Sequence, residues 1–97
     1  MPGYITLFKF TEKGLADIKN SPQRMKQNRE LVEKAGGRLI GVWVTMGEYD
    51  LVAVAESPDD ETAARVALMV GGQGTVTTQT MRAFSEEEFA RIVGGMP

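Results

Sequence analysis

The residues best placed to do chemistry form a Gly-Glu-Tyr-Asp segment at 47–50, between two strongly β-forming runs. Residues 38–46 and 49–56 are rich in β-branched and aromatic residues and lack proline, so they predict adjacent antiparallel strands. Gly47 suits the first central position of a two-residue type II′ turn, which requires a positive φ. Asp50 then lies just inside the second strand, where it is the candidate general base.

The chain of 97 residues contains no histidine and no cysteine. This composition excludes an imidazole base, a Ser-His-Asp triad, a thiol nucleophile, a disulfide and any zinc or iron site built from His or Cys. Acid–base chemistry would fall to Asp, Glu, Lys or Tyr, and a metal would need oxygen ligands. Because the sequence has no Asp-x-Asp-x-Asp-Gly loop, we expect neither a metal nor a cofactor.

The turn sets the register of the hairpin and so decides which side chains share a face. The expected opposed pairs are Met46 with Tyr49, Val44 with Leu51, Val42 with Ala53, and Ile40 with Ala55. That face is wholly apolar, and the other is largely apolar around Trp43, with a polar corner at Thr45 and Asp50. One face of an antiparallel sheet is usually exposed to water. Two apolar faces therefore indicate helices on one side and a second copy of the chain on the other.

Strand and helix signals divide the rest of the chain into a single domain, 1–97. The predicted elements are a strand at 4–10, a helical turn at 11–18, a helix at 21–35, the hairpin, a helix from 57 to 70, a strand at 75–84 and a helix at 85–93. Ser-Pro pairs open the two long helices and Gly-Gly pairs end them, while Ser85 and Glu88 form a capping box. The last strand is polar on both faces, which favours a sheet edge. The order β-α-β-β-α-β-α predicts a ferredoxin-like α+β fold with an antiparallel sheet and an extra C-terminal helix.

Composition and charge indicate an ordinary globular protein, with 42% hydrophobic and 25% charged residues. No apolar run approaches the roughly 20 residues of a membrane span, and the N-terminus lacks a signal-peptide pattern, so we expect a cytoplasmic protein without membrane contact. Residues 1–38 carry a net charge of +4 and the remainder −6. The basic helix at 21–35 has no aromatic residues among its basic ones and no known nucleic-acid-recognition motif. We therefore expect a solvated helix face and no nucleic-acid binding.

Five segments together resemble a known family. They are Tyr4-Ile5-Thr6-Leu7, Ser21-Pro22, the stretch from Thr45 to Val52, Ser57-Pro58-Asp59-Asp60, and Arg82-Ala83-Phe84-Ser85. In order and spacing they resemble the GYD family of small bacterial and archaeal proteins, over nearly the whole chain. The resemblance implies a dimeric α+β barrel, in which two ferredoxin-like sheets pack face to face. Relatives of that fold include cofactor-free monooxygenases, haem enzymes and amino-acid-sensing regulators, so the resemblance implies a fold and no particular reaction.

A face-to-face dimer would enclose a pocket for a small, mostly apolar or weakly anionic ligand between its sheets. Small aliphatic residues of the second long helix suit close packing on Ile5 and Leu7, which predicts that the opposite face of the first strand, with Tyr4, lines the pocket. The candidate ligand-binding residues are Thr6, Phe8, Trp43, Thr45, Asp50 and Arg82.

Each candidate also has an alternative role. Asp50 would be a base if hydrophobic walls raise its pKa, or an ionised partner of Arg82, or a structural acceptor for backbone amides or Thr45. Trp43 would stack on a ligand or form dimer core, and Arg82 would hold an anion or protect a sheet edge. Tyr49 is expected to pack in the core under the helices.

Three functions follow from this sequence. The first is a homodimeric small-molecule-binding module. The second is a cofactor-independent monooxygenase or isomerase that uses Asp50 as base, and the third is a structural or assembly protein.

Overall fold

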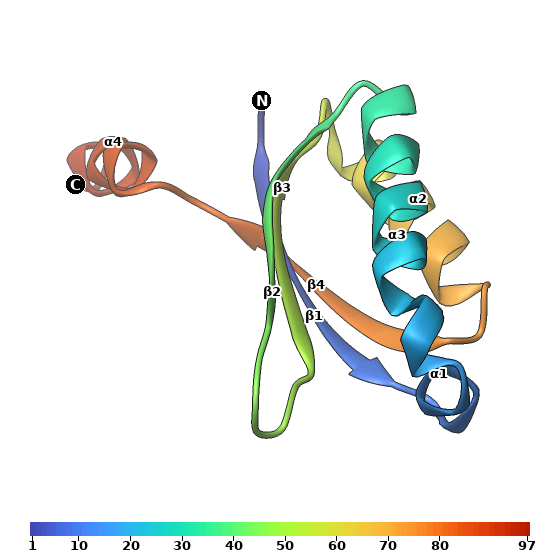
Figure 1. Cartoon of the computed structure of the whole chain (residues 1–97). Coiled ribbons are helices and arrows are strands. Elements are labelled where there is room, and N and C mark those ends of the chain that lie inside the picture. The colour runs from blue at the N-terminus through green and yellow to red at the C-terminus, as the bar shows by residue number, and fades with distance from the viewer.

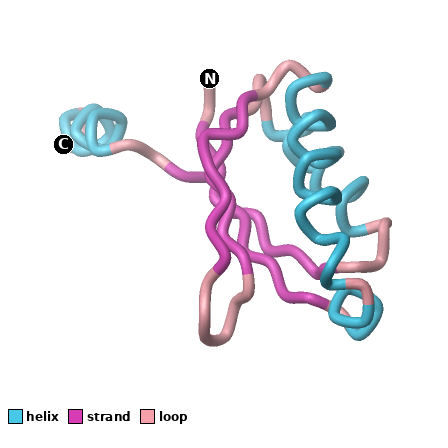
Figure 2. The backbone as a smooth tube through the Cα atoms, viewed as in Figure 1, coloured by secondary structure: helices cyan, strands magenta, loops and turns pink.

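A computed structural model describes all residues, 1–97, and confirms the ferredoxin-like α+β fold (Figures 1 and 2). The elements are β1 (Gly3–Phe10), α1 (Glu12–Ala16), a 3-10 turn (Ile18–Asn20), α2 (Ser21–Lys34), β2 (Arg38–Val44), β3 (Leu51–Glu56), α3 (Asp60–Gly71), β4 (Val76–Ala83) and α4 (Glu86–Gly94). None of these helices combines the length and the apolar composition needed to cross a membrane.

The four strands form one antiparallel sheet in the order β2-β3-β1-β4. Helices α2 and α3 lie on one face of this sheet, and no helix covers the other (Figure 1). The polar strand β4 lies at an edge, as predicted. The helix α4 stands away from the sheet, on the side opposite to α2 and α3 (Figure 1).

Local signals place the ends of the helices. Asp59 caps α3 by accepting the Thr62 N–H at 2.8 Å, and the hydrogen bonds from Thr62 hold the pKa of Asp59 below its usual range. Gly36, with a φ of +86°, follows α2 in a Schellman arrangement in which the Gly37 N–H donates to the Val32 carbonyl at 3.0 Å. The predicted N-cap at Ser21 is wrong by one residue, because Asn20 is the cap, and the predicted helix start at Ser57 is wrong as well, because α3 begins at Asp60 after the Asp59 cap.

The predicted faces of β1 are wrong. Tyr4, Thr6 and Phe8 face the helices, because they pair with Ala55, Ala53 and Leu51 of the covered face. Ile5 and Leu7 lie on the uncovered face. The alanines of β3 leave space beneath the helices, and the large β1 side chains occupy it.

The hairpin register is confirmed in the middle of the two strands and wrong at both ends, since Met46 and Tyr49 do not pair. Val44 pairs with Leu51 and Val42 with Ala53, but a β-bulge between Leu39 and Gly41 shifts the following pairs by one residue. Leu39 therefore pairs with Ala55 in place of the predicted Ile40, which is exposed. A Cβ on Gly41 would lie only 2.7 Å from the Trp43 ring, so glycine lets the indole lie flat on the strand.

Candidate functional site

The Gly-Glu-Tyr-Asp segment lies in a longer loop than the sequence predicts. The Thr45 N–H donates to the Asp50 carbonyl at 2.8 Å, which leaves a four-residue loop at 46–49. The Thr45 hydroxyl donates to the Tyr49 carbonyl at 2.6 Å. In a two-residue turn the Tyr49 carbonyl would accept the Met46 N–H. The Thr45 hydroxyl donates to that carbonyl instead, so the longer loop forms. Gly47 has a φ of +117° and makes the bend, as predicted.

Asp50 is half-buried and joins the hairpin to β1. Its Oδ2 accepts the backbone N–H of Phe10 at 2.9 Å, and its own N–H donates to the Phe8 carbonyl at 2.8 Å. The carboxylate therefore takes the place of a strand carbonyl at the end of β1. These contacts favour the structural alternative for Asp50, in which its carboxylate accepts a backbone amide. That amide belongs to Phe10 of β1.

Tyr49 does not pack under the helices, so this prediction is wrong. Its hydroxyl donates to the Gln79 Oε1 at 3.1 Å, and the Lys9 Nζ lies 5.2 Å from its ring centre. Lys9 and Gln79 belong to the uncovered face. Because Tyr49 lies in the loop, its side chain does not follow the alternation of a strand.

The six candidate ligand-binding residues lie in four places. Thr6 and Phe8 lie under the helices, where the Thr6 and Thr80 hydroxyl oxygens are 3.0 Å apart. Trp43 lies on the uncovered face and is 54% exposed. Thr45 and Asp50 lie at the hairpin loop, and Arg82 lies on the same face as Tyr4. The ligand-binding roles remain predictions, but one chain does not gather these side chains into a single pocket.

A cavity of about 130 Å³ lies between the sheet and the helices α2 and α3. It is mostly apolar, with Thr6 and Phe8 on the sheet side and Met25 of α2 and Ala67 of α3 on the helix side. Arg24 also lines this cavity. The sequence did not single out Arg24, because it is one of several basic residues in the same helix.

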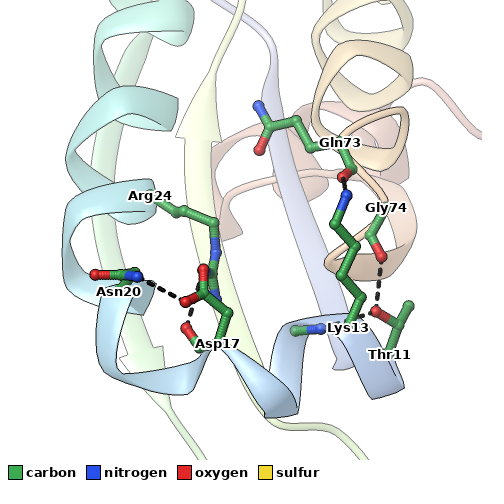
Figure 3. Close-up of polar contacts among 8 residues, drawn as sticks. Thr11, Lys13, Asp17, Asn20, Arg24, Gln73 and Gly74 are labelled. Carbon is green, nitrogen blue, oxygen red and sulfur yellow. Dashed lines mark hydrogen bonds and ion pairs between the residues drawn. The ribbon is translucent and has the colours of Figure 1, made fainter.

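Arg24 takes part in a group of polar contacts at the start of α2 (Figure 3). The Arg24 Nη1 donates to the Asp17 Oδ2 at 2.9 Å, and the Asn20 amide donates to the other oxygen of the same carboxylate at 2.6 Å. The Arg24 Nη2 is buried and has no hydrogen-bond partner. Arg24 therefore keeps one donor available beside an apolar space.

A second group of contacts ties α1 to the loop before β4 (Figure 3). The Lys13 Nζ donates to the Gln73 carbonyl at 3.2 Å, and the Thr11 hydroxyl donates to the Gly74 carbonyl at 2.7 Å. These bonds hold the connection from β1 to α2, which contains α1, against the loop that joins α3 to β4.

At the opposite end of β1, Tyr4 and Arg82 connect the sheet to two helices. The Tyr4 hydroxyl donates to the Asp60 Oδ1 at 2.5 Å, and burial, together with the bond to and the charge of Asp60, raises the pKa of Tyr4 to about 12. The Arg82 guanidinium lies 4.4 Å from the Phe84 ring centre and 3.6 Å from the Glu88 Oε2. Arg82 is therefore already engaged within its own chain.

The uncovered face of the sheet is apolar. We call it the open face, and its apolar side chains are Ile5, Leu7, Trp43, Val52, Val54 and Met81. Lys9, Tyr49 and Gln79 form a polar corner near the hairpin. No group of three or more Asp and Glu side chains is arranged to hold a metal ion.

Comparison with known proteins agrees with the fold and gives the family. The chain is 36% identical over 84 residues to a Thermus thermophilus protein named glutamine synthetase and cystathionine beta-lyase binding protein, covering 86% of this chain and 88% of the relative. The crystal structure of TTHA0845, also from Thermus thermophilus, superposes with a TM-score of 0.57 at 22% identity, covering 88% of this chain and 95% of that one, and this likeness concerns the fold alone. The model of the GYD domain matches residues 4–93, and the chain therefore belongs to the GYD family.

Proposed function

We propose that the protein is a homodimeric binding module for other proteins, and that its partners are metabolic enzymes of the kind its relative is named for. The open face is the observation that supports the homodimer. Six apolar side chains lie on one surface of a sheet, and no element of the chain covers them. A contiguous apolar surface of this kind marks a site of protein association.

A second copy of the chain is the occupant that suits the open face best. The surface is a sheet face, and two sheets pack well face to face about 10 Å apart with their side chains interdigitated. A two-fold axis would bring the same apolar strip of each copy together. Trp43 supplies a large aromatic side chain of the type that dominates the energy of such interfaces.

The enzyme partners are inferred from the relative. The relative is named as a binding protein for glutamine synthetase and cystathionine beta-lyase, and the likeness extends over most of both chains. We infer that this protein binds enzymes of the same kinds through surfaces that the dimer leaves exposed. Such a protein would act by association, without a reaction of its own.

Self-association is tested by sedimentation equilibrium on the purified protein and on the variant Val54→Glu. We expect the unmodified chain to have twice the mass of one chain at micromolar concentration and Val54→Glu to be a monomer, because a carboxylate would be buried in an apolar interface. Leu68→Glu, on the exposed surface of α3, is the matched control and stays dimeric. Trp43→Ser is a second open-face variant in case Val54→Glu does not fold. An unmodified chain that is monomeric up to about 100 µM overturns the homodimer.

Enzyme binding is tested separately with purified glutamine synthetase and cystathionine beta-lyase from the source organism. We expect at least one of them to bind the immobilised dimer with a Kd of micromolar order, the range of specific but reversible complexes. Leu68→Glu, which changes the exposed outer surface of α3 in a chain that stays dimeric, tests whether that surface takes part in the binding. Absence of binding by both enzymes at about 100 µM would overturn this part of the proposal.

The cavity under the helices favours a second candidate function, small-molecule binding. About 130 Å³ of mostly apolar space, with the free Arg24 Nη2 among its lining residues, suits a small apolar molecule that carries a hydrogen-bond acceptor or a carboxylate. Thr6 and Phe8 would then contact the ligand from the sheet side. This is the site we propose in place of a pocket between two sheets.

Thermal unfolding with short-chain carboxylates and the alcohols of equal length tests this candidate. A ligand that binds only the folded state raises the Tm, and we expect carboxylates to do so more than alcohols. Ala67→Leu, which fills part of the cavity, should abolish the shift while leaving the fold intact. An equal, zero shift for all compounds at millimolar concentration would overturn small-molecule binding.

A further inference from the structure

We propose that α4 packs against the second copy in the homodimer, so that each chain extends its C-terminal helix over its partner. This inference rests on the homodimer proposed above, and it assigns to α4 a role that the open face alone does not require. Its evidence comes from the extension of the molecule, the apolar side of α4 and the contacts that fix its position.

The chain is too extended for a compact monomer of its size. Its radius of gyration is 14.6 Å, whereas a compact domain of this length has about 12.5 Å. Its accessible surface is 6611 Å², against roughly 5,500 Å² for a compact monomer of the same mass. The excess of roughly 1,100 Å² is comparable to the 800 Å² or so that each partner buries in a standard protein interface.

The helix α4 carries a row of exposed apolar side chains. Phe89, Ile92 and Val93 are 62%, 49% and 46% exposed, and their spacing places them on one side of the helix. The opposite side carries Glu87 and Arg91. Because a nine-residue helix is marginal in water, its stability depends on packing of such an apolar side.

The position of α4 is fixed before any partner binds. Ser85 and Glu88 form the predicted capping box, with bonds of 3.0 and 3.1 Å. Arg82 holds the first turn to β4, because its guanidinium pairs with Glu88, lies over the Phe84 ring and donates to the Gly3 carbonyl at 3.2 Å. A helix placed in this way presents its apolar side at low entropic cost.

A second copy is the occupant that the arrangement favours. The helix α4 lies beyond the sheet on the side of the open face, not on the side of α2 and α3 (Figures 1 and 2). A copy seated on the open face occupies that same side, so a single partner covers both surfaces. In a two-fold dimer the contact occurs twice, once for each α4.

The test compares two double variants of the full chain by sedimentation equilibrium. Phe89→Ser with Ile92→Ser removes the apolar side, and we expect the dimer Kd to rise about tenfold or more. Glu87→Ser with Arg91→Ser changes the opposite side and lowers helix propensity more than the first variant does, because Glu and Arg are better helix formers than Ser whereas Phe and Ile are similar to it, and we still expect a Kd within about twofold of the unmodified chain. An unchanged Kd for the first variant overturns the role of α4 while leaving the homodimer in place.

Hydrogen exchange of the α4 amides gives an independent readout. We expect these amides to be protected in the dimer and to lose protection in the monomeric Val54→Glu variant, whose substitution lies on the open face. Equal exchange of α4 in the dimer and the monomer would overturn the proposal, and so would loss of enzyme binding by the Phe89→Ser, Ile92→Ser variant with an intact dimer. A monomeric unmodified chain would instead overturn the homodimer itself.

Discussion

Tyr4 is the residue through which the sheet holds the start of α3. Its side chain is buried, its hydroxyl donates to Asp60, and its pKa is raised to about 12 from an ordinary value of 10.0. A raised folded-state pKa means that the neutral phenol is favoured by folding. The resulting stabilisation is complete below about pH 10 and is lost as the pH rises from 10 toward 12.

We predict that Tyr4→Phe lowers the free energy of unfolding at pH 7 by about 1 kcal/mol, because it removes one hydrogen bond to a carboxylate that is itself exposed. The variant should also lose less stability than the unmodified chain between pH 10 and 12. Urea unfolding followed by circular dichroism at several pH values measures both effects. Tyr49→Phe is the matched control, since the hydroxyl it removes binds exposed Gln79.

Asp50 allows the structural and catalytic alternatives to be separated. Asp50→Ala removes the acceptor of the Phe10 N–H and should lower the free energy of unfolding by about 1–3 kcal/mol. Asp50→Asn keeps an acceptor oxygen, so we expect a much smaller loss of stability and an unchanged affinity for the enzymes that we propose as partners.

A base at Asp50 would be recognised by turnover and not by stability. Under that alternative, in which the protein is a cofactor-independent monooxygenase or isomerase, Asn would fold normally and abolish turnover as completely as Ala. Equal stability of Asp50→Ala and the unmodified chain would contradict the structural role.

At the level of elements, the order of the helices and most of their ends follow from the sequence because their signals are local. The glycine at 36 and the box at Ser85 each act through bonds to residues a few positions away. The Ser-Pro pairs place the starts of the two long helices less well, since the caps are Asn20 and Asp59. Threonines on both faces of the last strand predict an edge position, and the sheet order agrees.

Predictions that depended on the choice between two apolar faces failed. Strand β1 is apolar on both sides, so its sequence does not say whether Phe8 or Leu7 packs under the helices. The alanines of β3 decide this, and they lie far away along the chain. The bulge at Ile40 and the longer loop at the hairpin also arise from local bonds and ring packing that the strand pattern does not encode. The six site residues therefore lie in four places.

Gly14 shows how closely two elements approach. A Cβ at this position would lie 2.1 Å from the Thr75 carbonyl oxygen, and that same oxygen accepts the Thr11 N–H at 3.1 Å. We predict that Gly14→Ala lowers the free energy of unfolding by about 1–3 kcal/mol, because α1 has to move away from the residue that precedes β4.

Gly71→Ala is the control for the intrinsic effect of the substitution. No neighbouring atom lies within 4 Å of a Cβ there, and the residue is helical, so alanine should stabilise by about 0.5–1 kcal/mol. Chemical denaturation of both variants measures the difference. Equal stability of the two variants would show that the backbone near Thr75 moves to accept the new Cβ without any loss in the free energy of unfolding.

For the molecule as a whole, the small buried core and the exposed apolar side chains both favour association of two chains. Nine of the 97 residues are buried and no large side chain is fully buried, so one chain encloses little core. Meanwhile the open face and α4 leave apolar side chains in water. Association of two chains would bury both surfaces, and the folded state would then gain much of its stability from the dimer.

This coupling predicts that thermal stability depends on protein concentration. When unfolding separates two chains, each tenfold rise in concentration stabilises the dimer by about 1.4 kcal/mol, or about 0.7 kcal/mol for each chain. For a domain of this size we therefore expect the Tm to rise by about 3–5 °C per tenfold increase. Differential scanning calorimetry from about 5 to 500 µM, two decades of concentration, resolves such a change. Val54→Glu should have a lower Tm that does not vary with concentration, whereas Leu68→Glu should follow the unmodified chain. A Tm independent of concentration in the unmodified protein would mean that a single chain is stable with its open face in water.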